Sequence, residues 1–78
     1  MKLPRDISGE ELATLLRRLG YEVVRQTGSH IRLSRGSEHH ITIPRHRELK
    51  VGTMSNIVKD LADHLDISRE EVIGALWE

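Results

Sequence analysis

The turn "TGSH", residues Thr27 to His30, ends in a side chain that can do acid–base chemistry. A tight turn between two strands favours residues that accept positive φ or bond their own backbone, and Thr27, Gly28 and Ser29 meet that requirement. His30 is not needed for the geometry of the turn. Because the unperturbed pKa of an imidazole is about 6.5, this side chain can take or give a proton near neutral pH. We therefore interpret His30 as a candidate general acid or base.

Basic residues gather around this turn, although the whole chain has a formal net charge of zero. Between residues 25 and 50, six bases outnumber two acids. The bases are Arg25, Arg32, Arg35, Arg45, Arg47 and Lys50. From residue 60 onward, six acids face a single base. This asymmetry indicates that the middle of the chain meets an anion, while the tail stays in water or meets a basic partner.

A phosphodiester is an anion that suits these side chains. Guanidinium and ammonium groups donate charge-assisted hydrogen bonds to phosphate oxygens and stabilise the negative charge that develops during cleavage. Arg32 is the first choice for this role, because it follows His30 by two residues and so shares one face of a strand with it. The other candidates are Arg25, Arg45 and Lys50.

The four remaining histidines have weaker grounds for a catalytic role. His46 lies in a basic loop, where it either positions substrate and donates a proton to a leaving oxygen, or stabilises the loop. His40 shares the face of His30 by strand parity, and we interpret it as an exposed strand residue. His39 points the other way and His64 lies on an acidic helix, so we expect both to be structural or solvated.

Two alternative kinds of site, a metal site and a covalent serine nucleophile, fit the residues less well. His39, His40 and His46 are close in the sequence, but a structural zinc ion takes four nitrogen or sulfur ligands and the chain has no cysteine to complete such a set. Ser29 as a covalent nucleophile lacks the base and acid of a triad, and its position suits a turn. We therefore expect neither a metal ion nor another cofactor.

Capping residues and apolar spacing predict three helices. A capping box of Ser8 and Glu11 starts the first, which carries a stripe of leucines. Thr53 can cap the second, a long amphipathic helix. The third is short and begins at a second capping box, residues 68–71.

Three strand-like runs, residues 21–26, 30–35 and 39–43, lie between the first two helices and are joined by connections short enough to require antiparallel pairing. Alternation predicts an apolar inner face and a polar outer face. The inner residues would be Tyr21, Val23, Ile31, Leu33, Ile41 and Ile43. The outer residues would be Glu22, Val24, His30, Arg32, Ser34, His40 and Thr42.

This order predicts an α+β fold, α-β-β-β-α with an added C-terminal helix, in which two helices cover one face of a three-stranded antiparallel sheet. A chain of 78 residues suits one domain over 1–78, with a core at about 9–65 and a helical extension at 66–78. With no cysteine, no signal peptide and no apolar run long enough to cross a bilayer, we expect a cytoplasmic protein with no membrane contact.

Three segments carry a resemblance to a known family. "GYEVVRQTGSHIRL" is similar to the region around a G-S-H motif, "ITIPRH" to a strand ending in T-[VI]-P-x-H, and "GTMSNIVKDL" to a helix start of the form G-T-[LM]-x-x-I-[LV]-K. In this order they resemble the HicA family, also called YcfA-like, the small toxins of HicA–HicB toxin–antitoxin pairs. The resemblance covers roughly Gly9 to Leu65, and three ordered motifs are far more specific than one.

The resemblance implies a double-stranded-RNA-binding-like fold and metal-independent cleavage of mRNA, which we expect to be single-stranded. It equates His30 with the family's catalytic histidine, and Gly28 and Ser29 with the turn that places it. The expected RNA-binding residues are Gly28, Ser29, Arg25, Arg32, Arg45, His46 and Lys50. A HicB-type antitoxin would cover the active face. The acidic end, "DISREEVIGALWE", and the adjacent histidines of "EHH" depart from the family pattern.

Two other classes of function stay open from the sequence. A non-catalytic RNA-binding module with the same fold would bind RNA in a salt-dependent way and leave its strands intact. A protein-interaction module would instead bind a partner protein through the acidic tail and Trp77, and would show neither RNA cleavage nor salt-sensitive RNA binding.

Overall fold

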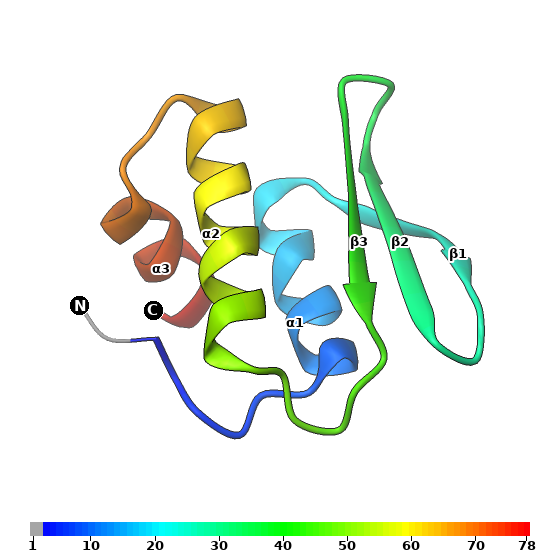
Figure 1. Cartoon of the computed structure of the whole chain (residues 1–78). Helices are drawn as coiled ribbons and strands as arrows, with labels where there is room; N and C mark the ends of the chain where they lie inside the picture. Colours follow the sequence, from blue (N-terminus) through cyan, green and yellow to red (C-terminus); the bar gives the residue numbers. More distant parts are fainter. Residues whose placement is uncertain (1–2) are drawn as a thin grey trace.

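The computed structural model describes residues 3–78, and its elements follow the expected order (Figure 1). They are α1 (Gly9–Leu16), a short 3-10 turn η1 (Arg17–Leu19), β1 (Glu22–Gln26), β2 (His30–Arg35), β3 (His39–Pro44), α2 (Val51–Leu65) and α3 (Arg69–Trp77). The strands form an antiparallel sheet in the order β1-β2-β3. Helices α1 and α2 lie on the same side of this sheet, which confirms the predicted fold class.

The helix ends show which local signals determine the fold. Both capping boxes form: the Ser8 hydroxyl accepts from the Glu11 amide at 3.0 Å, and Ser68 and Glu71 make the same contact at 3.0 Å. The prediction that Thr53 caps α2 is wrong. The helix begins at Val51, with Lys50 at the N-cap position and no side-chain cap, and Met54 is its first buried residue.

The core lies between the sheet and the helices. Four isoleucine and leucine side chains from the two better covered strands are at most 4% exposed: Ile31, Leu33, Ile41 and Ile43. They meet the buried stripes of α1 and α2, and α3 extends the same cluster with Val72 and Leu76. The Arg18 guanidinium donates to the Leu76 carbonyl at 3.2 Å, so docking onto η1 holds the glycine-containing α3 in place.

Strand β1 departs from simple alternation. Val23 lies opposite Leu33, but Arg25 lies opposite Arg32, so one extra residue, Val24, forms a bulge. Val23 faces inward as predicted, because it is paired with the buried Leu33, but it is 46% exposed since β1 is an edge strand. Because cross-strand partners share a face, the bulge turns Arg25 onto the same face as Arg32.

Ser34 also differs from the prediction, because it is 8% exposed instead of solvated. Its hydroxyl folds back over the turn between β2 and β3 and donates to the Gly36 carbonyl. Glycine at that position has a φ of +58°, a left-handed conformation that L side chains rarely adopt. The serine therefore belongs to the construction of the turn.

His39 and His64 form a structural cluster with the buried Tyr21, as expected for histidines outside the site. The His39 Nε2 lies 3.1 Å from Asp60 Oδ1, to which it donates because a carboxylate only accepts, and in the neutral ring Nδ1 then accepts from the Tyr21 hydroxyl at 2.6 Å. The rings of His39 and His64 stack with centroids 4.2 Å apart. These contacts tie β3 to α2.

Replacing Tyr21 with Phe is expected to destabilise the protein by about 1 kcal/mol at neutral pH, through loss of one buried hydrogen bond. Burial raises the pKa of the Tyr21 hydroxyl above its ordinary 10.0, opposed by Arg35 and assisted by Asp60 and Glu38. The unfolded chain therefore loses this proton first, so the contribution of Tyr21 is complete below its unfolded pKa and falls as pH rises above it.

Urea unfolding of both proteins at about pH 8 and about pH 11 measures this effect. The stability advantage of the wild type over the Tyr21→Phe variant should shrink at the higher pH. An advantage that is independent of pH would contradict the shifted ionisation.

Candidate functional site

His30 is the first residue of β2 and lies opposite Pro44 of β3, with its side chain exposed. The turn before it is held by the Thr27 hydroxyl, which accepts from the His30 amide at 3.0 Å and from the Ser29 amide at 3.3 Å. The Thr27 amide donates to the His30 carbonyl at 2.9 Å. Side-chain bonds of Thr27, not a left-handed glycine, therefore shape this turn, and Gly28 has only open space beside its α-carbon.

Within residues 3–78, the His30 ring has one hydrogen-bond partner, the Ser29 hydroxyl. Its Nδ1 lies 2.9 Å from the Ser29 hydroxyl, which leaves Nε2 directed away from that contact. A hydroxyl can donate to or accept from the ring, so Ser29 suits either protonation state. The geometry gives an exposed imidazole with one restrained nitrogen and one nitrogen available to a substrate.

A row of polar side chains crosses the uncovered face next to His30. Arg25, Arg32 and Thr42 are cross-strand partners on β1, β2 and β3, and all three are exposed. Within residues 3–78, neither Arg25 nor Arg32 takes an ion pair or a side-chain hydrogen bond. The α-carbons of alternate residues in a strand are about 7 Å apart, so Arg32 lies about that far from His30 along β2. The sheet therefore brings two free guanidinium groups beside the imidazole.

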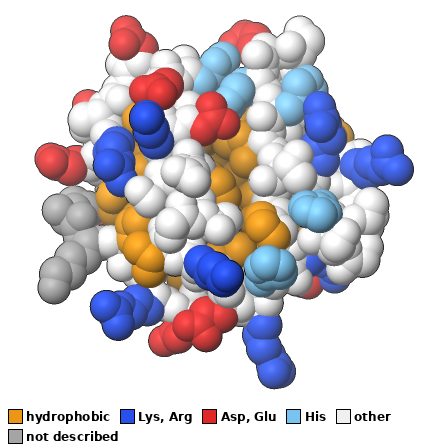
Figure 2. Space-filling model, viewed as in Figure 1, with side chains coloured by type: hydrophobic (Ala, Val, Ile, Leu, Met, Phe, Trp, Pro, Cys, Tyr) orange, Lys and Arg blue, Asp and Glu red, His pale blue; other side chains and the backbone are white. Residues whose placement is uncertain are grey.

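The loop after β3 brings the other expected residues to the same end of the sheet. The Arg45 amide donates to the Ser29 carbonyl at 2.8 Å, so this loop lies against the turn that carries His30. His46 and Lys50 are exposed on it, with Lys50 preceding the first turn of α2. Figure 2 shows several His, Lys and Arg side chains over the strands and this loop on the face it displays.

Arg45 is placed differently from the other expected RNA contacts. Its guanidinium donates to the Thr27 carbonyl at 2.8 Å and to Glu10 Oε1 at 2.9 Å, and its side chain is 27% exposed. Sequence reasoning missed the part played by Glu10, since nothing local links a residue of α1 to one 35 positions later. The one signal in the sequence was that the two residues carry opposite charges, and many other pairs of residues in the chain do so as well.

The three histidines considered for a metal site do not converge. His39 and His40 are successive strand residues opposite Arg35 and Ser34, so their side chains leave opposite faces of the sheet. His39 is engaged by Tyr21 and Asp60. Among residues 3–78, no group of three His, Cys, Asp or Glu side chains is arranged to hold a metal ion.

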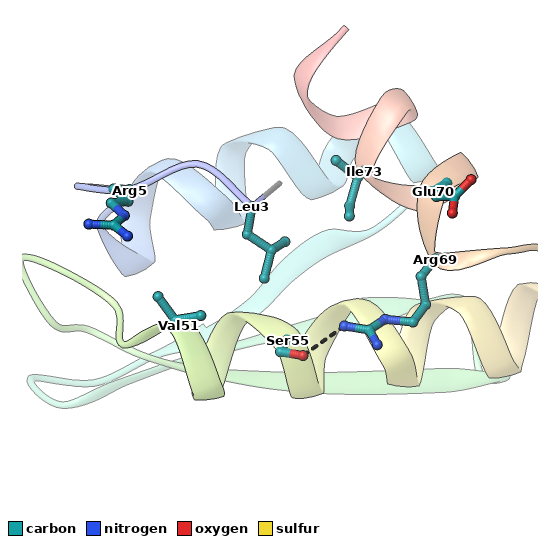
Figure 3. A pocket seen from close by; sticks show the side chains of 7 residues that line it. All are labelled: Leu3, Arg5, Val51, Ser55, Arg69, Glu70 and Ile73. Atoms are coloured by element: carbon teal, nitrogen blue, oxygen red, sulfur yellow. Dashed lines mark hydrogen bonds between the residues drawn. The ribbon is translucent and has the colours of Figure 1, made fainter. Parts of the chain in front are cut away.

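A hollow lies away from His30, between the N-terminal segment, α2 and α3 (Figure 3). It has a volume of about 560 Å³ and is lined by Leu3, Arg5, Val51, Ser55, Arg69, Glu70 and Ile73. Arg69 donates to the Ser55 hydroxyl across it at 2.8 Å. No residue of the turn or of the uncovered sheet face lines this hollow. The candidate site is thus an open surface, which suits an extended substrate better than an enclosed small molecule.

Fold and site together define a small α+β protein that presents an exposed histidine and free arginines on the uncovered face of an antiparallel sheet. The family model described as the HicA toxin of bacterial toxin–antitoxin matches residues 9–62, and the chain belongs to this family. The match ends within α2 and does not include α3. No curated protein and no solved structure matches the chain. Within residues 3–78, no helix is long and apolar enough to cross a membrane.

Proposed function

We propose that this member of the HicA family is a metal-independent endoribonuclease that cleaves single-stranded mRNA with His30 as its catalytic side chain. The observation that carries the proposal is the exposed His30 imidazole, held at Nδ1 by Ser29 and placed beside the row that contains Arg32. The 2′-hydroxyl of a nucleotide would attack its own phosphate. His30 would take the proton from that hydroxyl or give one to the departing 5′ oxygen. The products are a 2′,3′-cyclic phosphate and a 5′-hydroxyl.

The two arginines support a phosphate ligand on this face. Arg25 and Arg32 lie directly opposite each other on neighbouring strands, an arrangement in which like charges destabilise a sheet. A phosphate between them would relieve that repulsion and accept hydrogen bonds from both guanidinium groups. During cleavage the same groups would stabilise the charge on the pentacovalent phosphorus. Gly28 and Ser29 at the turn, with His46 and Lys50 on the loop, would extend the contact along the RNA strand.

A HicB-type antitoxin is the proposed inhibitor, acting by covering this same face. The support is membership of a toxin–antitoxin family, which implies a partner, and the exposure of every residue of β1 together with His30, Arg32, His40 and Thr42 on β2 and β3. Because mRNA is the proposed substrate, the proposed location is the cytoplasm.

Incubation of the purified protein with end-labelled single-stranded RNA in EDTA tests the activity. We expect fragments ending in 2′,3′-cyclic phosphates, at a rate that added magnesium does not increase, and we expect a HicB-type antitoxin to suppress them. Salt-sensitive RNA binding with intact strands would show instead that the chain is a non-catalytic RNA-binding module.

A further inference from the structure

The Arg45 guanidinium bridges two parts of the fold that are remote in sequence. One nitrogen, Nη1, donates to the Thr27 carbonyl in the turn before His30, and the other, Nη2, contacts Glu10 in the first turn of α1. The planar guanidinium presents these donors in a fixed geometry, so both contacts restrain the same group. Arg45 therefore ties the turn to the helix.

The backbone contacts of Arg45 act on the same turn. Its amide donates to the Ser29 carbonyl at 2.8 Å, while the Thr27 amide donates to the His30 carbonyl at 2.9 Å. The carbonyls of Thr27 and Ser29 are thus both held by Arg45, one through the side chain and one through the backbone. A displacement of Arg45 would therefore displace the backbone of the turn that precedes His30.

We propose that Glu10 is a positioning residue for His30, acting through Arg45. This inference rests on the proposed function and gives Arg45 a role distinct from binding RNA phosphate. The Glu10 carboxylate fixes the guanidinium, the guanidinium fixes the turn, and the turn fixes the direction of the imidazole. A displacement of about 1 Å in a catalytic group can cost a large part of the rate, so restraint of this turn matters for proton transfer.

Glu10→Ala tests the proposal, and the chain offers a matched control in Glu70→Ala. Glu10 and Glu70 occupy equivalent positions, two residues after Ser8 and Ser68 in the two capping-box helices. Both variants lose the same favourable charge near a helix N-terminus, but Glu70 has no contact with Arg45. Any difference between the variants therefore reports the contact with Arg45.

Amide hydrogen exchange measures the restraint without reference to RNA. In Glu10→Ala we expect the Thr27 and Arg45 amides to exchange about threefold to tenfold faster, the modest effect of a partly exposed ion pair. Amides in the buried strand β2 should keep their rates, and Glu70→Ala should leave the turn unchanged. Unchanged exchange at Thr27 and Arg45 in Glu10→Ala would overturn the proposal.

The kinetics of RNA cleavage separate positioning from a simple charge effect. A positioning role predicts that Glu10→Ala lowers kcat by about threefold to tenfold with KM unchanged. If Arg45 instead served as an RNA contact restrained by Glu10, removing the carboxylate would lower KM and leave kcat intact, which would overturn the proposal. A wild type that cleaves no RNA would count against the proposed function, while the exchange rates would still decide whether Glu10 holds the turn.

Arg45→Lys gives an independent check, because it keeps the positive charge and loses the planar, two-armed group. We expect faster exchange at Thr27 and a lower kcat, with little change in the salt dependence of RNA binding. A variant with normal exchange and a normal kcat would show that charge alone matters at this position.

Discussion

His30→Ala should abolish RNA cleavage, with a fall in rate of at least about a hundredfold, the usual contribution of a general acid or base. The loss is expected because the described residues place no second titratable side chain within hydrogen-bond distance of this imidazole, whose partner is the Ser29 hydroxyl. The measurement is the initial rate of cleavage of labelled single-stranded RNA in EDTA, under conditions where the wild type cuts it.

The variant should stay folded. The His30 side chain is exposed, and its structural contacts run through the backbone: the amide donates to Thr27 Oγ1 and the carbonyl accepts from the Thr27 amide. Circular dichroism and urea unfolding should therefore resemble the wild type. His40→Ala is the matched control, since His40 is an exposed histidine of β3 on the same face, opposite Ser34. It should cleave RNA normally, whereas cleavage by His30→Ala at the wild-type rate would refute the assignment.

Local signals in the sequence were sufficient to predict the order of elements and the face of the sheet on which His30 lies. Each capping box is complete within four residues, and Ile31 and Leu33 alternate with His30 and Arg32 without interruption. Short-range patterns of this kind determine which backbone groups are satisfied and which side chains face the helices. The direction of His30 followed from that alternation.

The bulge in β1 could not be predicted from the same pattern. "EVVRQ" contains no glycine or proline to mark an irregularity, and Val23 and Val24 both suit a strand. Its position depends on pairing with β2, a contact between segments separated by the turn. This bulge changes the candidate site. Strict alternation would place Arg25 and Arg32 on different faces of the sheet, whereas the bulge makes them cross-strand partners on one face.

The intramolecular contacts of Arg45 could not be predicted for a related reason. A basic residue in a loop beside a candidate site suggests a phosphate contact, and the opposite charges of Glu10 and Arg45 do not by themselves indicate that the two residues lie within reach. Only the folded arrangement, in which the end of β3 returns to the start of α1, brings the two charges together. Long-range ion pairs are set by topology, so composition and spacing carry little information about them.

Gly9 marks the point where α1 approaches the loop after β3 most closely. A β-carbon at this position would lie 2.1 Å from the Pro44 carbonyl oxygen and 3.3 Å from the Arg45 α-carbon, both backbone atoms. The Gly9 amide also donates to the His46 carbonyl at 3.0 Å. Because backbone atoms cannot swing aside as a flexible side chain does, any larger residue must separate the helix from the loop.

Gly9→Ala should therefore destabilise the protein by about 2 to 3 kcal/mol, the upper part of the range for overpacking a buried position. In a chain of this size that corresponds to a fall in Tm of roughly 10 °C or more. Gly52→Ala is the matched control, because Gly52 also lies in the first turn of a helix and a β-carbon there meets nothing within 4 Å. Gly52→Ala should leave the stability of the protein unchanged or raise it by up to about 1 kcal/mol, since alanine has a higher helix propensity than glycine. If thermal and urea unfolding gave both variants the same stability, the contact between Gly9 and Pro44 would not be tight in solution. If Gly9→Ala alone is destabilised, the loop that holds the turn of His30 is packed directly against the start of α1.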